Sequence, residues 1–285
     1  MYYNFSTNNN SPTPITNFHS NISFNLSINR FSSTIYPHWS IMSRPEKNSL
    51  LLPQLDIMEN GSVQVNIDIN ISNMTNCICL GAGNYVVDDI DASLCTHYIY
   101  GFATLDASTY TMVPFDPDTD VGSKNFYEQF VNLRIKYPNK KFLIAIGGWV
   151  DSRTSKYSTL LASATRRANF VTKAVEFIKK YRFDGLDLDY EYPAYEQSAT
   201  EKTTFALWVK ELKAAFEPYG WELTAAVAAG KSTIDAGYDV PEISKYLDAI
   251  HLMTYDLHGS WESVIDHHAT LYGKTIADTL TVDYA

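Results

Sequence analysis

The sequence predicts an α/β fold built around a parallel sheet. From residue 96 onward, segments of strand type alternate with segments whose apolar residues recur at helical spacing. One strand segment, residues 142–146, is apolar throughout, which is typical of a strand buried on both faces. Another, residues 185–191, alternates carboxylates with apolar side chains. Strands that alternate with helices usually pair in parallel, and the connecting helices then pack on the sheet. We therefore expect a parallel sheet covered by helices.

The expected elements follow one another in order along residues 96–255. Strands are expected at residues 96–103, 142–146, 185–191, 222–229 and 248–255. Apolar residues at helical spacing predict helices across residues 126–133, 170–181 and 205–216, with a short helix near Pro241. Pro138 should end the first of these helices, and Ser198 with Glu201 should form a capping box at the start of the third.

Two segments of different composition divide the chain. Residues 1–76 contain fourteen Asn but only three Lys or Arg, and such a composition buries too little apolar surface to offset the entropy of ordering. We therefore expect most of this segment to be disordered. Residues 63–72 are the exception, because apolar and polar residues alternate there as in a half-buried strand. Residues 77–285 form the predicted folded domain.

Three carboxylates of the acidic segment share one face of the expected strand. A period of two places Asp187, Asp189 and Glu191 on the same side. Like charges at this spacing disfavour each other's ionised forms, so the pKa of at least one carboxyl should be raised. A protonated carboxyl beside ionised carboxylates is the arrangement that glycosidases use to donate a proton to a leaving oxygen. The alternatives are a metal site or a solvated acidic loop, but a solvated loop would not place apolar residues at every second position.

The charge and the composition of the chain argue against several kinds of binding partner. The formal net charge of -10 argues against nucleic acid, whose phosphates require a basic face. No apolar run approaches the length of a membrane span. A neutral polysaccharide is compatible with this charge. The histidines between residues 251 and 268 are not spaced as metal ligands, so no metal is expected.

Three motifs resemble those of one enzyme family. Residues 184–191 resemble the Asp-Gly-x-Asp-x-Asp-x-Glu signature of the family 18 glycoside hydrolases, which comprise chitinases and non-catalytic relatives. Residues 145–149 and 253–261 match further motifs of that family in the same order, and residues 89–102 are most similar to its arthropod members. The resemblance, which covers about residues 81–285, implies a (β/α)8 TIM barrel. Only its second to sixth strands are found, so we expect an incomplete barrel without a recognisable first strand.

The resemblance implies an endo-acting chitinase, which hydrolyses β-1,4 linkages between N-acetylglucosamine units of chitin or chito-oligosaccharides. The reaction would retain configuration and use the acetamide of the substrate as nucleophile, without a cofactor. Glu191 would protonate the glycosidic oxygen and later deprotonate water. Asp189 would orient the acetamide, Asp187 would share a proton with Asp189, and Tyr255 would donate its hydroxyl to the acetamide carbonyl.

A substrate groove at the carboxyl ends of the strands is also implied by the resemblance. Trp149 and Trp261 would supply stacking faces for sugar rings, and Asp256 would accept hydrogen bonds from sugar hydroxyls. The other groove residues would be Tyr100, Phe102, Gly147, Gly148, Tyr192, Met253 and Thr254. Packing is the alternative for several of these, because Tyr100, Phe102 and Met253 are of types common in cores, and Gly147–Gly148 could mark only a close approach of backbones.

The family also implies a location and a cysteine pairing. Its members are mostly extracellular, which we expect here as well, although the first residues show neither the basic start nor the apolar core of a signal peptide. A cysteine at the position of Cys95 commonly pairs in the family with one in the first strand, and Cys77 or Cys79 would take that part.

Two other functions compete with the chitinase. One is a chitin-binding, lectin-like relative that has lost catalysis, but such relatives usually lack the catalytic glutamate, and Glu191 is present. The other is a chain that is inactive by itself, because a site without the last two strands lacks preorganised walls.

Overall fold

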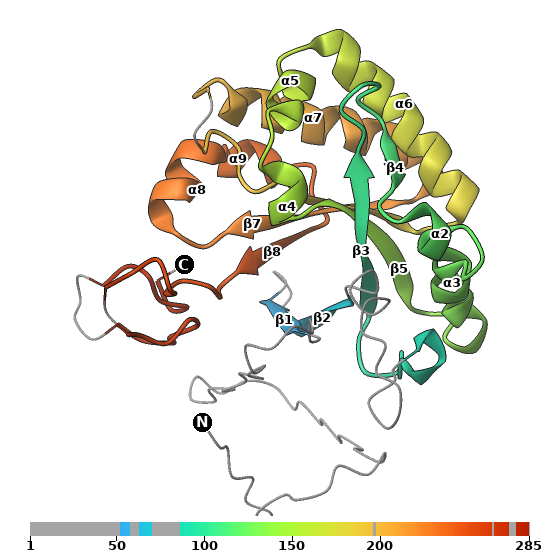
Figure 1. The fold of residues 1–285 in the computed structure, drawn as a ribbon, viewed down its shortest axis with the longest axis horizontal. Coiled ribbons are helices and arrows are strands. Elements are labelled where there is room, and N and C mark those ends of the chain that lie inside the picture. Colours follow the sequence, from blue (N-terminus) through green and yellow to red (C-terminus); the bar gives the residue numbers. More distant parts are fainter. Residues whose placement is uncertain are drawn as a thin grey trace, which may run out of the picture. The chain divides into compact units, whose positions relative to one another are not determined.

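A mostly parallel sheet organises the chain (Figure 1). The computed structural model describes residues 86–195, 198–263, 265–273 and 278–284 with side chains, and residues 52–57 and 63–69 as backbone. The strands are β1 (Leu52–Ile57), β2 (Val63–Ile69), β3 (His97–Leu105), β4 (Met112–Pro114), β5 (Lys141–Gly147), β6 (Gly185–Asp189), β7 (Glu222–Ala228) and β8 (Ala249–Met253). Their order is β1-β2-β3-β5-β6-β7-β8, with β4 paired to β3. The predicted α/β fold with a parallel sheet is confirmed.

Helices connect the successive parallel strands and pack against one face of the sheet (Figure 1). They are α2 (Pro117–Asp120), α3 (Phe126–Lys136), α4 (Trp149–Ser152), α5 (Lys156–Leu161), α6 (Ala164–Tyr181), α7 (Glu201–Phe216), α8 (Lys231–Gly237) and α9 (Val240–Ile243), with short 3-10 helices at Val87–Asp89 and Glu217–Tyr219. The three longer helices expected from the sequence correspond to α3, α6 and α7, and the short one near Pro241 to α9.

The sheet contains two strands that the barrel motifs do not include. The strand predicted at residues 63–72 is β2, which pairs in parallel with β3 and so occupies the place of the first barrel strand that was not recognised. Strand β1 was not predicted; it pairs antiparallel with β2 and comes close to β8. The parallel part of the sheet thus has six strands instead of the five expected. The predicted disorder in residues 1–76 falls outside the described residues.

The two faces of the sheet differ in chemistry. One face packs against the helices through a large apolar core, to which the strands contribute Tyr98, Tyr100, Phe142, Ile144, Ile146, Leu186, Leu188, Leu223, Ala225 and Val227. On the opposite face, Ile99, Leu143 and Ala145 form a small separate cluster. The strand register places Asp187 beside Ala145, on this second face. The carboxylates of the acidic strand therefore lie on the face turned away from the helices.

Helix α7 is fixed at both ends by carboxylates. Near its C-terminal half, Glu211 forms a bidentate pair with the buried Arg167 of α6, at 3.0 and 3.1 Å. At its start the predicted capping box is wrong, because the N-cap is Thr200 and no side chain caps the helix. The carboxylate of Glu201, the first residue of α7, turns instead toward the segment that follows β6.

Candidate active site

Asp187 is held in the sheet by side chains of the two neighbouring strands. Its side chain is only 5% exposed, and its Oδ1 accepts a hydrogen bond of 2.5 Å from the hydroxyl of Thr224 on β7. The Nε2 atom of His251 on β8 lies 3.5 Å from the same oxygen. Asp189, two residues later on the same strand, is 8% exposed. Of the three carboxylates predicted on one face, Asp187 and Asp189 are buried. Thr224 and His251 are neighbours that no sequence motif indicated.

Glu191 lies just beyond the end of β6. Its backbone N–H donates to the hydroxyl of Ser152, at 3.0 Å. Burial raises the pKa of the Glu191 carboxyl; a hydrogen bond from Tyr192 opposes this, and the negative charge of Asp256 adds to it. The sequence predicted a raised pKa for at least one carboxyl of the row. At Glu191 the largest cause of the raised pKa is burial, and the carboxylate that adds to it is Asp256, which lies outside the row.

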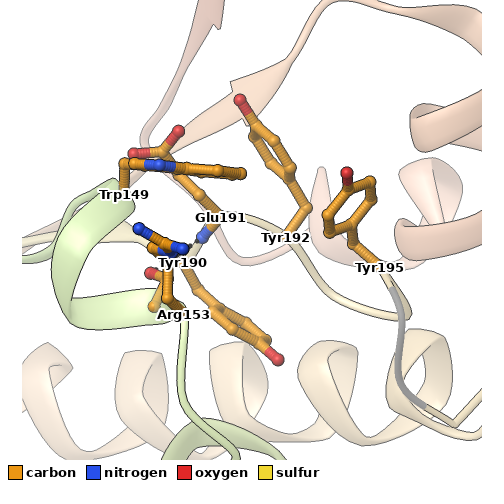
Figure 2. A pocket seen from close by; sticks show the side chains of 7 residues that line it. Trp149, Arg153, Tyr190, Glu191, Tyr192 and Tyr195 are labelled. Carbon is orange, nitrogen blue, oxygen red and sulfur yellow. Dashed lines mark hydrogen bonds between the residues drawn. The ribbon is translucent and has the colours of Figure 1, made fainter.

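A pocket of about 250 Å³ opens beside Glu191. Its lining residues come from the ends of β5 and β6 and from the segments that follow them: Trp149, Ser152, Arg153, Tyr190, Glu191, Tyr192 and Tyr195. Figure 2 shows the rings of Trp149, Tyr192 and Tyr195 around the pocket, while the ring of Tyr190 points to the opposite side. Trp149 is 47% exposed, so one of its faces is available to a ligand. Apolar rings beside a few polar groups suit a sugar ring, which has apolar faces and a polar edge.

Two of the implied groove residues, Gly147 and Gly148, have a packing role. Gly147 has a φ of +121°, and a Cβ atom there would lie 2.0 Å from the carbonyl oxygen of Asp189. The N–H of Gly148 donates to that same oxygen at 2.8 Å. A Cβ atom on Gly148 would lie 3.3 Å from the ring of Phe102. The glycines therefore allow β5 to end directly against the end of β6.

We expect Gly147→Ala to lower the free energy of unfolding by about 3 kcal/mol, because the new methyl group overlaps backbone atoms of β6 and the φ is unfavourable for alanine. Gly220→Ala is the matched control. Gly220 also has a positive φ, of +64°, but no atom lies within 4 Å of its Cβ position, so it should cost only about 1 kcal/mol. Urea denaturation of both variants measures the difference. Equal losses would show that the approach of β5 to Asp189 does not require a glycine.

The structure separates Tyr100 from Phe102. Tyr100 is fully buried, donates its hydroxyl to Asp120 at 2.6 Å, and packs edge-to-face on Tyr127 and Phe130. Its predicted place in the groove is wrong, because its side chain belongs to the core under the helices. Phe102 is partly exposed and packs on the opposite face, near Gly148.

Of the predicted site residues at the end of β8 and after it, Asp256 is the one whose charge acts on Glu191. Met253 ends the strand and is 8% exposed, while Thr254 and Tyr255 are partly exposed. Asp256 has a φ of +52° and acts on Glu191 through its charge. Trp261 is 67% exposed and does not line the described pocket.

Several residues of this site were not predicted from the sequence. Ser152, Arg153 and Tyr195 line the pocket, and the only signal for them was their position shortly after the strand-end residues Trp149 and Glu191. His268 was missed too. Its Nδ1 accepts the N–H of Asp256 at 3.4 Å, and its carbonyl oxygen accepts the N–H of Leu257 at 2.8 Å. These two hydrogen bonds tie residues 256–257, just after β8, to His268 further along the same segment.

The described residues were also compared with what metal binding, a disulfide bond or a membrane span would require. Within the described residues, no group of three His, Cys, Asp or Glu side chains is arranged to hold a metal ion. Cys95 is buried and has no disulfide partner among the described residues, and the predicted partners Cys77 and Cys79 lie outside the described part of the chain. None of the described helices is both long and apolar enough to span a bilayer.

Known proteins similar to this chain are chitinases and their relatives. Residues 72–285 match the model of the glycosyl hydrolases family 18. Probable chitinase 10 of Drosophila melanogaster is 47% identical over 67% of the chain, which corresponds to 8% of that protein, and the endochitinase of Manduca sexta is 43% identical over 68% of the chain and 36% of that protein. The chain thus spans less than half the length of these two relatives.

Solved structures agree with the sequence comparison. The second catalytic domain of the Ostrinia furnacalis Group II chitinase matches with a TM-score of 0.68 and 42% identity, over 71% of this chain and 54% of that chain. Human YKL-39, described as a pseudo-chitinase with retained chitooligosaccharide binding, matches with a TM-score of 0.62 and 30% identity, over 72% of this chain and 57% of that chain.

Proposed function

Since the chain belongs to glycosyl hydrolase family 18, as its three motifs predicted, we propose that it is the catalytic part of a chitinase. Its substrate would be chitin or chito-oligosaccharides, cleaved at β-1,4 linkages between N-acetylglucosamine units. The observation that carries this proposal is the placement of Glu191, a partly buried carboxyl with a raised pKa that lines a pocket together with exposed aromatic rings. A carboxyl that keeps its proton toward neutral pH is what a general acid requires.

The proposed reaction assigns one task to each acidic residue. Glu191 donates its proton to the glycosidic oxygen as the bond between that oxygen and C1 breaks. The acetamide carbonyl oxygen of the same sugar attacks C1 and forms a positively charged oxazolinium ring, which Asp189 stabilises. Water then attacks C1 and gives its proton to Glu191, while the bond from C1 to the acetamide oxygen breaks and the acetamide is restored. This returns the acid to its starting form and retains the configuration.

The remaining residues orient these groups. Asp187, fixed by Thr224 and close to His251, lies two residues before Asp189 on β6 and tunes its charge. Tyr255 donates its hydroxyl to the acetamide carbonyl. Trp149 offers a half-exposed ring on which a sugar can stack. No cofactor takes part in the proposed reaction.

A second candidate is chito-oligosaccharide binding without hydrolysis. The observation that favours it is the match to human YKL-39, which is described as a pseudo-chitinase that retains chitooligosaccharide binding. The aromatic pocket would serve a binding protein equally well. The presence of Glu191 at the signature position favours the enzyme.

The proposal is tested with two fluorogenic substrates that differ only in the acetamide. The chain should release the fluorophore from a labelled chitotrioside and not from the matching labelled cellotrioside, because only the first carries the internal nucleophile. Cleavage of both would contradict the substrate-assisted mechanism. Binding of chitotriose, followed by tryptophan fluorescence, without release from either substrate would identify a binding protein.

A further inference from the structure

Glu201 is a buried carboxylate at the start of α7 whose partners lie in the segment that carries Glu191. It is 3% exposed. Its Oε2 accepts the hydroxyl of Tyr190 and the backbone N–H of Ala194, both at 3.0 Å. Tyr190 immediately precedes Glu191, and Ala194 follows three residues after it. One oxygen atom of Glu201 is therefore bonded to residues on both sides of the proposed acid, Glu191.

One residue of this segment has a strained backbone conformation. Ala194 has a φ of +63°, a left-handed conformation that costs a residue other than glycine about 1 kcal/mol. The hydrogen bond from its N–H to Glu201 is the described interaction that holds this residue in place. Without that acceptor, we expect the backbone at Ala194 to leave its left-handed conformation.

The opposite side of the segment is already fixed. The N–H of Glu191 donates to Ser152 of α4, and the ring of Tyr190 stacks on Tyr157 of α5 with centroids 4.8 Å apart. Glu201 supplies the contact from α7. Glu191 is thus held between elements that come before and after it in the sequence.

Burying a carboxylate is costly unless hydrogen bonds compensate for the lost water. The two described donors to Glu201 are a hydroxyl and an amide, both neutral, and its Oε1 is buried without a hydrogen-bond partner among the described residues. The position at the N-terminus of a sixteen-residue helix favours negative charge but does not require burial. A glutamate that only stabilised the helix would lie in solvent.

We propose that Glu201 is a positioning residue for Glu191, which fixes residues 190–194 so that the acid carboxyl stays buried beside the pocket. This inference rests on the proposed function of Glu191 as the acid. Glu201→Ala removes the acceptor for both donors. We expect kcat to fall about tenfold while KM stays within about twofold, because the sugar-stacking rings remain and only the acid is misplaced.

Glu201→Gln is the conservative variant. Its side-chain carbonyl oxygen can accept both hydrogen bonds, so it should restore most of the kcat that Glu201→Ala loses. Glu211→Ala is the matched control on the same helix. It removes a glutamate bound to Arg167, far along α7 from the acid segment, and should lower stability without changing kcat.

The decisive measurement does not depend on turnover. Side-chain 13C NMR of glutamate-labelled protein, with Glu191→Gln to assign the signal, gives the pKa of Glu191 in each variant. Because burial is the main cause of the raised pKa, we expect it to fall toward the ordinary glutamate value in Glu201→Ala. It should stay near the wild-type value in Glu201→Gln and Glu211→Ala.

The outcomes separate the two proposals. An unchanged Glu191 pKa and an unchanged kcat in folded Glu201→Ala would overturn the positioning role. If the Glu191 pKa in Glu201→Ala differs from that of the wild type, but the wild type cleaves no chito-oligosaccharide, the positioning role is supported and the proposed enzyme is rejected. If Glu201→Ala does not fold, Tyr190→Phe removes only the hydroxyl donor, and a smaller fall of the Glu191 pKa supports the role while no fall overturns it.

Discussion

Glu191→Gln should lower kcat for a labelled chitotrioside by about three orders of magnitude, within the range that general acid–base catalysis contributes. The amide has the shape of the carboxyl but cannot transfer a proton to the leaving oxygen. KM should change little, because the aromatic rings around the pocket are untouched. Glu242→Gln is the control. Glu242 lies on the short helix α9 and pairs at the surface with Lys245, which follows that helix, so this variant should leave kcat unchanged.

A loss of less than about tenfold in Glu191→Gln would assign the acid role to another group. Circular dichroism of the variant must match the wild type for the comparison to hold. A loss of activity in Glu242→Gln of the same size would point to a general effect of charge instead of proton transfer.

The same substitution should stabilise the fold at neutral pH. The folded pKa of Glu191 is raised above its ordinary value of 4.5, so between these two pKa values the folded state binds more protons than the unfolded state. Stability therefore falls as pH rises through this window, and the loss persists above it. Glutamine carries no such penalty. The Tm of Glu191→Gln should exceed that of the wild type at pH 7, and the difference should disappear below the ordinary pKa. A difference that is independent of pH would contradict this origin.

Asp151→Ala should lower the free energy of unfolding by about 4 kcal/mol, near the middle of the range for breaking a buried ion pair. The side chain of Asp151 is 6% exposed and pairs with Lys156, which is 12% exposed. The carboxylate also accepts the hydroxyl of Tyr157 at 2.8 Å, the N–H of Leu105 at 3.2 Å and the hydroxyl of Thr104. Removing it leaves a buried ammonium group and several donors without their acceptor.

Two further variants identify the cause of that loss. Asp235→Ala removes the carboxylate of the surface pair with Lys231, whose side chains are 63% and 56% exposed, and should cost less than about 0.5 kcal/mol. Adding Lys156→Met to Asp151→Ala should recover part of the stability, because the uncompensated charge is then absent. Chemical denaturation measures all of these. A double variant as unstable as Asp151→Ala alone would place the cost in the lost hydrogen bonds.

Much of the fold could be predicted because its signals are local. The apolar run of β5 and the alternation in β6 each depend on residues of one strand, and the structure contains both strands. The prediction failed where the answer depends on which side of the sheet the helices cover. Alternation puts Tyr100 on one face of β3, but nothing in the sequence marks that face as the one under the helices.

The sequence indicated the candidate residues of the site, but not their burial or their hydrogen-bond partners. The signature located Asp187, Asp189 and Glu191, yet the main cause of the raised pKa of Glu191 is burial, which depends on distant segments. Glu201 shows the same limit. Its spacing from Ser198 is that of a capping box, and the partners that its carboxylate has instead are contributed by Tyr190 and Ala194, which a local pattern does not reveal.

The close approach of β5 to β6 also limits how this region can diverge in evolution. At Gly147 every side chain would begin with an atom 2.0 Å from the carbonyl of Asp189, so this position offers no route to a new property. Val150, three residues later, is 74% exposed and meets no such restriction. Changes in ligand preference can therefore accumulate in the residues just after the strand end, while the contact between the ends of β5 and β6 tolerates no such change.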